Sequence, residues 1–170
     1  MKRIVLIVGL IIGTILAINI AVMVNLMYNN PNFEGNAVVG YTIQILVFSV
    51  IYFGIRNYRD KQLGGVISFG KGFKTGALIV LVASTMYVVA WLIGYYLFVP
   101  DFIDRYAEHV INTCAKDQLE ATKASMESFK KMYENPVFVV LITYAEVLPV
   151  GLLVALISAL LLKKKTVGIQ

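Results

Sequence analysis

Glu146 is the residue best placed for chemistry in this sequence, because it is the single carboxylate within the apolar stretch of residues 137–162. It lies nine residues into that stretch, about 13 Å along a helix. An ionised carboxylate so deep in a bilayer costs about 2.5 kcal/mol or more, so the group must pair, contact water or stay protonated. Pro149 leaves a backbone carbonyl beside it without its usual donor. The side chain could serve protons, cations or a ligand, or simply bond a neighbouring helix.

Three further polar side chains lie at a similar depth, one in each of the other apolar stretches. By helical rise, Asn19 and Trp91 lie about 13 Å and Gln44 about 10 Å from the outer ends of their stretches. Ordinary bonds between membrane helices, worth about 0.6 kcal/mol each, would account for such groups. The more specific hypothesis is that Glu146 and Asn19 line a small polar cavity open to the outside. The sequence indicates that the four polar side chains lie at a similar depth, but it does not show whether they face one another.

Four apolar stretches must position these groups, namely residues 4–28, 37–55, 75–99 and 137–162. The chain of 170 residues is 59% hydrophobic with a mean hydropathy of +0.78, above the 45–50% apolar content that is typical of soluble domains. The last stretch, as a helix of about 39 Å, exceeds the ~30 Å hydrocarbon core. Because backbone groups find no water in lipid, each stretch should be a helix. We expect an all-α membrane protein forming one membrane domain over residues 1–170.

Small residues at four-residue spacing mark two of these stretches as close-packing helices. Such stripes let the backbones of membrane helices approach closely. The stripe of the first stretch comprises Gly9, Gly13, Ala17 and Ala21, and that of the last comprises Gly151, Ala155 and Ala159. We therefore expect the first and last helices to pack together. A homodimer formed through either stripe is the alternative.

Two polar segments connect the apolar stretches. Residues 56–74 are basic and glycine-rich, and their apolar members suggest a short segment at the membrane interface. Residues 101–136 contain apolar residues at helical spacing among charged ones and no internal glycine. We expect one bent or two short amphipathic helices there, lying on the membrane surface or over the mouth of the bundle. A stripe in this segment is the candidate contact face for a partner outside the membrane, and it comprises Met126, Phe129, Met132 and Tyr133.

The basic residues predict the orientation. With four spans, ten of them fall on one side: Lys2, Arg3, Arg56, Arg59, Lys61, Lys71, Lys74 and Lys163 to Lys165. The other side has five bases against eight acids. The positive-inside rule then places both termini in the cytoplasm and residues 101–136 outside. This distribution explains the net charge of +5 without nucleic-acid binding.

The sequence lacks the patterns of common enzymes. It contains no GxGxxG, Walker A, HExxH or GxSxG motif. Its one cysteine, Cys114, and one histidine, His109, exclude an intrachain disulfide and a cysteine- or histidine-rich metal site within one chain. We expect no cofactor, no metal and no enzymatic activity.

Several short motifs resemble a known family. They are GGVISFGKGFKTG from Gly64 to Gly76, the Pro100-Asp101-Phe102 step, Asn135-Pro136, and Glu146-x-x-Pro149-x-Gly151 followed by a lysine tail. Together they resemble domain of unknown function 4199 over nearly the whole chain. The resemblance implies four apolar spans in a bacterial membrane and says nothing about activity. With the charge bias, it suggests a multi-pass protein of the bacterial cytoplasmic (inner) membrane.

Two functions from different classes fit these features. The first is a non-enzymatic accessory or interaction module that contacts the bilayer and a protein partner outside the membrane. The second is a small transporter or channel centred on Glu146, which would need a homo-oligomer because four helices are few and show no inverted repeat. Ligand, partner and oligomeric state stay open at this level.

Overall fold

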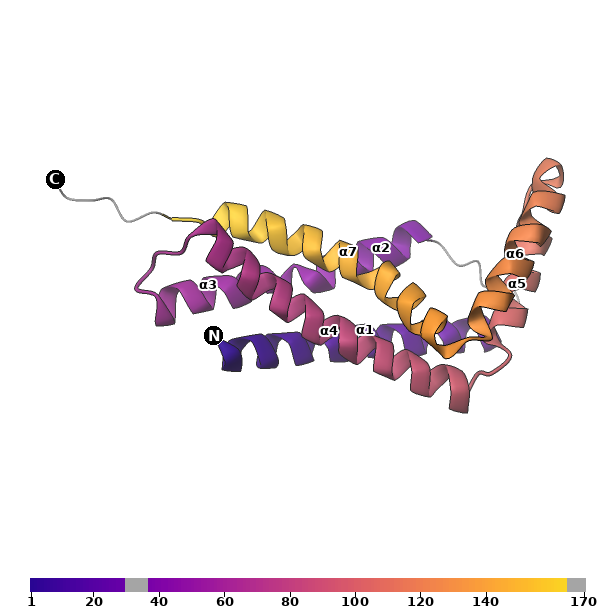
Figure 1. The fold of residues 1–170 in the computed structure, drawn as a ribbon, viewed down its shortest axis with the longest axis horizontal. Helices are drawn as coiled ribbons and strands as arrows, with labels where there is room; N and C mark the ends of the chain where they lie inside the picture. The colour runs from indigo at the N-terminus through magenta and orange to yellow at the C-terminus, as the bar shows by residue number, and fades with distance from the viewer. Residues whose placement is uncertain (30–36, 165–170) are drawn as a thin grey trace. The chain divides into compact units, whose positions relative to one another are not determined.

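Helices make up nearly all of the computed structural model, which describes residues 1–29 and 37–164 (Figure 1). The elements in chain order are α1 (Lys2–Asn29), α2 (Ala37–Phe48), α3 (Val50–Gln62), α4 (Phe69–Leu97), α5 (Phe102–Thr113), η1 (Lys116–Gln118), α6 (Leu119–Tyr133) and α7 (Pro136–Leu162). Four helical stretches are long and apolar enough to cross a membrane: Lys2–Asn29, Val38–Gln62, Phe69–Leu97 and Pro136–Leu162. The predicted all-α fold with four spanning helices is confirmed.

The second and third spans differ from their predicted limits of 37–55 and 75–99. The second runs to Gln62 and carries charged residues in its last two turns, where Arg56 and Asp60 pair at a spacing of four residues. The third begins at Phe69. Residues 56–62 of the segment expected at the membrane interface thus continue α3, and residues 69–74 begin α4. Their position at the interface stays a prediction. The charged residues end the apolar stretch, but the helix continues beyond it, because helical backbone hydrogen bonds also form in water.

Ser49 separates α2 from α3 with only a small disturbance. Its hydroxyl donates to the carbonyl of Leu46 over 2.6 Å, and its backbone conformation is still right-handed helical. Such a serine bond to a preceding carbonyl competes with the helical ladder and bends it. The two helices therefore count as one span.

The turn between α3 and α4 contains two glycines with positive φ, and it forms hydrogen bonds to the residues that follow α7. Gly64 and Gly65 have φ of +65° and +86°, a region that favours glycine, and the Gly65 N–H donates to the carbonyl of Arg59 over 3.0 Å. Ile67 and Lys164 then exchange two backbone hydrogen bonds of 3.2 and 2.9 Å. The end of the last helix is thus tied to this turn.

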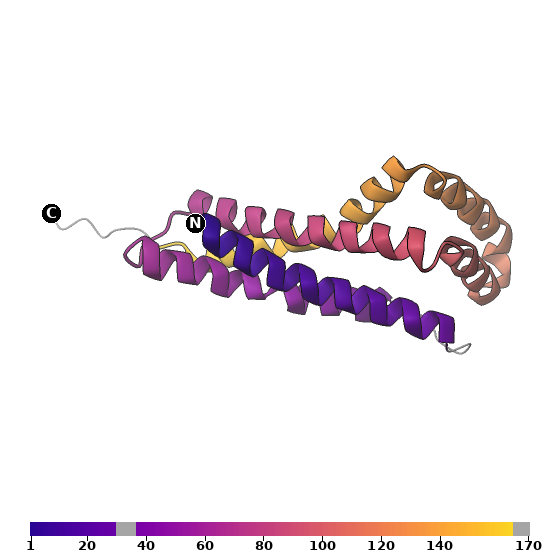
Figure 2. The same cartoon turned by 90° about the horizontal axis from the view of Figure 1, so that it is seen from below.

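The chain forms two compact units. Unit 1 comprises Met1–Tyr87 and Tyr144–Gln170, and unit 2 comprises Val88–Thr143. In unit 1, α1 runs beside the first part of α4 (Figure 2). Whether residues 1–170 act as one membrane domain stays a prediction.

Helix α4 is the shared partner of both small-residue stripes. A Cβ added at Gly9 would lie 2.7 Å from the Val82 Cβ, and one at Gly13 would lie 2.8 Å from the Met86 Cβ. From α7, Ala155 Cβ would lie 2.8 Å from a Cβ added at Gly76, and Ala159 approaches Gly72 in the same way.

The prediction that the two stripes pack against each other is therefore wrong, because both pack against α4 instead, each at different positions along it. The first stripe also ends early. Ala17 is half-buried and Ala21 is exposed. Four-residue spacing marks a face suited to close approach, but it does not name the helix that approaches.

Unit 2 contains the predicted amphipathic segment as two helices, α5 and α6, joined by η1. Aromatic rings hold the pair together. Tyr106 lies 6.3 Å from Phe129, and Tyr133 lies 5.5 Å from Tyr95 of α4, between ring centroids. The Lys130 Nζ is 2.6 Å from a carboxylate oxygen of Asp104. Phe129 and Tyr133, which were expected to face a partner, thus pack against other rings of the unit.

Candidate intramembrane polar site

A close three-helix contact sets the register of the polar residues in unit 1. A Cβ added at Gly151 of α7 would lie 2.6 Å from Val80 of α4 and 2.9 Å from the ring of Phe48 of α2. One helical turn further along each helix come Val147, Ser84 and Gln44. All three are buried. The register therefore places Gln44 and Ser84 at one level, in the contact of three apolar helices.

Gln44 and Ser84 each bury an oxygen atom without a hydrogen-bond partner in the described part of the chain. These atoms are Gln44 Oε1 and Ser84 Oγ, and the residues are 7% and 0% exposed. A buried polar atom left unpaired costs about 1–3 kcal/mol. The two oxygens therefore lower the stability of an otherwise apolar helix contact.

Thr85 and Tyr144 form a polar link beside this level. Their hydroxyl oxygens are 2.8 Å apart, and the Thr85 hydroxyl also lies 2.7 Å from the carbonyl of Leu81. Because the two residues belong to α4 and α7, the bond joins the helices that Gly151 already holds close together. It fixes the position of α7 just before Glu146.

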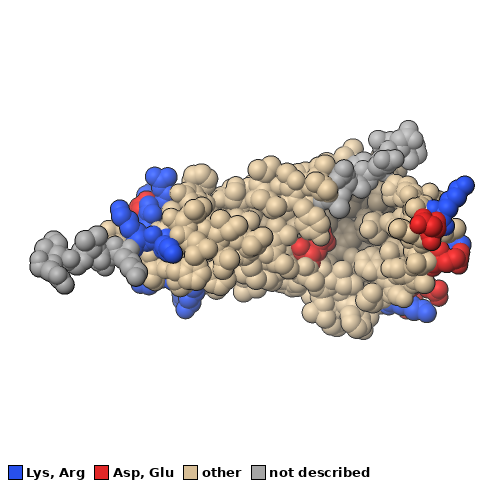
Figure 3. Space-filling model, turned by 90° about the horizontal axis from the view of Figure 1, so that it is seen from above, with Lys and Arg blue, Asp and Glu red and all other residues tan. Residues whose placement is uncertain are grey.

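Glu146 itself is exposed at the surface of unit 1. Pro149, Leu153 and Ile157 share its face of α7 by helical spacing and are exposed as well. Figure 3 shows acidic atoms surrounded by uncharged side chains, away from the basic side chains gathered where α3 ends and α4 begins. The carboxylate therefore belongs to an outward apolar stripe and not to the buried contact of Gln44 and Ser84.

Asn19 and Trp91 occupy different surroundings. Val8 of α1 approaches Gly54 of α3. Eleven residues forward from Val8 and eleven back from Gly54 bring Asn19 level with Ile43, which is next to Gln44. Asn19 is half-buried. Trp91 lies in unit 2, is 5% exposed and meets Phe102 edge to face at 4.8 Å between ring centroids. A joint role for the four predicted site residues stays a prediction.

Ser84, Thr85 and Tyr144 were not singled out from the sequence as site residues. A signal exists for them, since Ser84 and Thr85 are adjacent polar residues in an apolar stretch and Tyr144 precedes Glu146 by two residues. Short hydroxyl side chains can bond to their own helix, as Thr75 and Thr143 do, so their sequence alone does not mark a contact between helices.

The arrangement supplies hydrogen-bonding groups within an apolar layer. Within residues 1–29 and 37–164, no three side chains of His, Cys, Asp or Glu lie close enough to hold a metal ion. A carboxyl group can donate a hydrogen bond when protonated and accept one when ionised. Glu146 is therefore suited to bind a polar group that another molecule brings to the exposed stripe.

Four helices that are long and apolar enough to cross a membrane define this protein as a multi-pass α-helical membrane protein. The chain belongs to the family described as Protein of unknown function (DUF4199), which it matches over residues 7–164. The resemblance that the glycine-rich segment and the Glu146 motif indicated is thus confirmed. No curated protein and no solved structure matches the chain.

Proposed function

We propose that the protein is a non-enzymatic interaction module that binds another membrane protein through the Glu146 face of α7. The single observation that carries this proposal is an exposed carboxylate on an apolar helix face. In lipid, an ionised group at this position costs about 2.5 kcal/mol or more. A polar group from a partner helix would remove that cost and fix the register of binding.

The same reasoning favours this face over the segment between α4 and α7. Phe129 is half-buried and Tyr133 is 8% exposed, because both pack within unit 2. Of the stripe proposed as a contact face outside the membrane, Met132 is exposed. A partner outside the membrane would therefore meet mainly charged side chains of α5 and α6, whereas the α7 face offers apolar area and one carboxyl group.

Photo-crosslinking in native membranes tests the proposal. A photoreactive amino acid in place of Leu153, which is 56% exposed on the Glu146 face, should capture a membrane protein. Glu146→Leu should reduce the yield at least about fivefold, the equivalent of roughly 1 kcal/mol for a polar contact between membrane helices. The matched control carries the photoreactive group at Ile18 of α1, which is 59% exposed, and its products should not change. Lipid-only products at position 153, or a yield that Glu146→Leu leaves unchanged, would contradict the proposal.

We propose the cytoplasmic membrane of a bacterium as the location, with both termini in the cytoplasm. The basic residues of the described termini, of the end of α3 and of the start of α4 support this orientation. The four helices that are long and apolar enough to cross a membrane support the membrane location but not the orientation.

The exposed carboxylate also suits a second function, a small transporter or channel built from several copies. Glu146 would then line a path between copies, since intramembrane acids commonly mark proton or ion pathways. Ion flux into proteoliposomes distinguishes the two functions. Flux that Glu146→Gln abolishes would favour transport, whereas no flux with a captured partner protein would favour the interaction module.

A further inference from the structure

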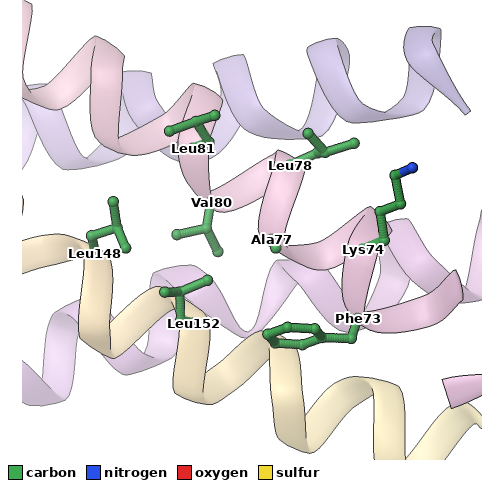
Figure 4. Close-up of a pocket in the computed structure, with 8 residues that line it drawn as sticks. All are labelled: Phe73, Lys74, Ala77, Leu78, Val80, Leu81, Leu148 and Leu152. Carbon is green, nitrogen blue, oxygen red and sulfur yellow. The ribbon is translucent and has the colours of Figure 1, made fainter. Parts of the chain in front are cut away.

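A groove of about 430 Å³ lies between α4 and α7 in unit 1. Figure 4 shows Val80 and Leu152 facing one another across it, with Phe73 and Lys74 at one end and Leu148 and Leu81 toward the other. Apart from Lys74, all residues that line it are apolar. Leu81 is 50% exposed, so the groove opens toward the lipid.

The aliphatic stem of Lys74 lines one end of the groove, and its charged group lies outside the apolar lining (Figure 4). Lys74 is exposed, and no ion pair forms to it or to Lys71 within the described residues. Lys71 lies one helical turn earlier, in the first turn of α4, where the positive end of the helix dipole also favours an anion. Both lysines belong to the basic end of unit 1, at which a lysine side chain can reach the headgroup layer.

The direction of the groove matches that of a lipid. From Lys74 to Leu81, α4 rises about 10 Å, from the charged end of the span into its apolar part. A lipid in the leaflet at the basic end would therefore place its phosphate near Lys74 and its chain along Phe73, Leu152 and Leu148. Basic pockets between membrane helices recognise anionic headgroups in this way.

We propose that this groove binds one acyl chain of an anionic phospholipid, with the lipid phosphate held by Lys74. The site is independent of Glu146, which occupies another face of α7. A helix of a second chain is a poorer occupant, because polar contacts help to join membrane helices and this groove, apart from Lys74 at one end, is lined by apolar side chains.

Lipid titration followed by native mass spectrometry tests the site. The delipidated full-length protein is titrated with phosphatidylglycerol or phosphatidylcholine of identical chains. Phosphatidylglycerol should bind about fivefold more tightly, which is the effect of one lysine near an anionic headgroup. Lys74→Gln should abolish that preference. Lys61→Gln, at the same end of unit 1 but outside the groove, is the matched control and should retain it.

A substitution that fills the groove separates chain binding from charge. Ala77→Phe should weaken both lipids at least about tenfold, because each buried methylene contributes about 0.8 kcal/mol. If that variant does not fold, Ala77→Leu provides the same test with less volume. Inorganic phosphate in excess should not displace the lipid. Equal binding of the two lipids, equal behaviour of the Lys74 and Lys61 variants, or unchanged binding in folded Ala77 variants would each overturn the proposal.

Discussion

At the scale of single residues, Ser84 and Thr75 offer a matched comparison of buried hydroxyl groups on α4. Both residues are fully buried, but Thr75 donates to the carbonyl of Lys71 over 2.8 Å, whereas Ser84 Oγ has no partner in the described chain. Desolvation of a hydroxyl is compensated only when it forms a hydrogen bond. The two residues should therefore respond to removal of the hydroxyl with opposite signs.

We predict that Ser84→Ala leaves the free energy of unfolding unchanged or raises it by up to about 1 kcal/mol. Thr75→Val should lower it by about 0.6 kcal/mol, which is the average value of a hydrogen bond in a membrane protein. Unfolding by detergent titration, followed by circular dichroism, measures both. A loss of more than about 1 kcal/mol in Ser84→Ala would mean that a water molecule or ligand bonds to Ser84 and Gln44.

The candidate site could be predicted from the sequence in part. Glu146 stands out because it is the single acid in its apolar stretch, and its depth follows from counting residues. Its outward direction does not follow, because the angle of a side chain around the helix acquires meaning only when the neighbours are known. The Gln44–Ser84 level was missed for the same reason, since it depends on the register of three helices around Gly151.

At the scale of elements, glycine determines where helices approach α4. We predict that Gly9→Ala lowers the free energy of unfolding by about 1–3 kcal/mol, the usual cost of overpacking. The new Cβ would lie 2.7 Å from the Val82 Cβ and 3.1 Å from the carbonyl oxygen of Ile79. Detergent unfolding measures the change.

Gly40→Ala in α2 is the matched control for this substitution. Nothing lies within 4 Å of a Cβ added there, so replacing glycine inside a helix should be neutral or stabilising by up to about 1 kcal/mol. If the two variants have the same free energy of unfolding, α1 and α4 do not approach each other closely at Gly9.

The number and type of the spanning helices could be predicted from the sequence, but their limits and partners could not. Apolar length identifies a spanning helix because lipid offers the backbone no other hydrogen bonds. The same rule does not locate the end of the helix, as the charged turns of α3 up to Gln62 show. Nor does this rule show that both small-residue stripes pack against α4, since a close approach depends on the surfaces of both helices.

At the scale of the whole molecule, orientation depends on charge and can be tested with the single cysteine of the chain. Cys114 follows α5 in the segment between the last two spans. We predict that a membrane-impermeant maleimide labels Cys114 in intact spheroplasts, because the positive-inside rule places this segment outside. A Cys114→Ala, Lys61→Cys variant carries its thiol at the basic end of α3 and should react only after the membrane is permeabilised. Labelling of the Lys61→Cys thiol in intact spheroplasts, with Cys114 protected, would show the inverted orientation and remove the charge argument for a cytoplasmic location of both termini.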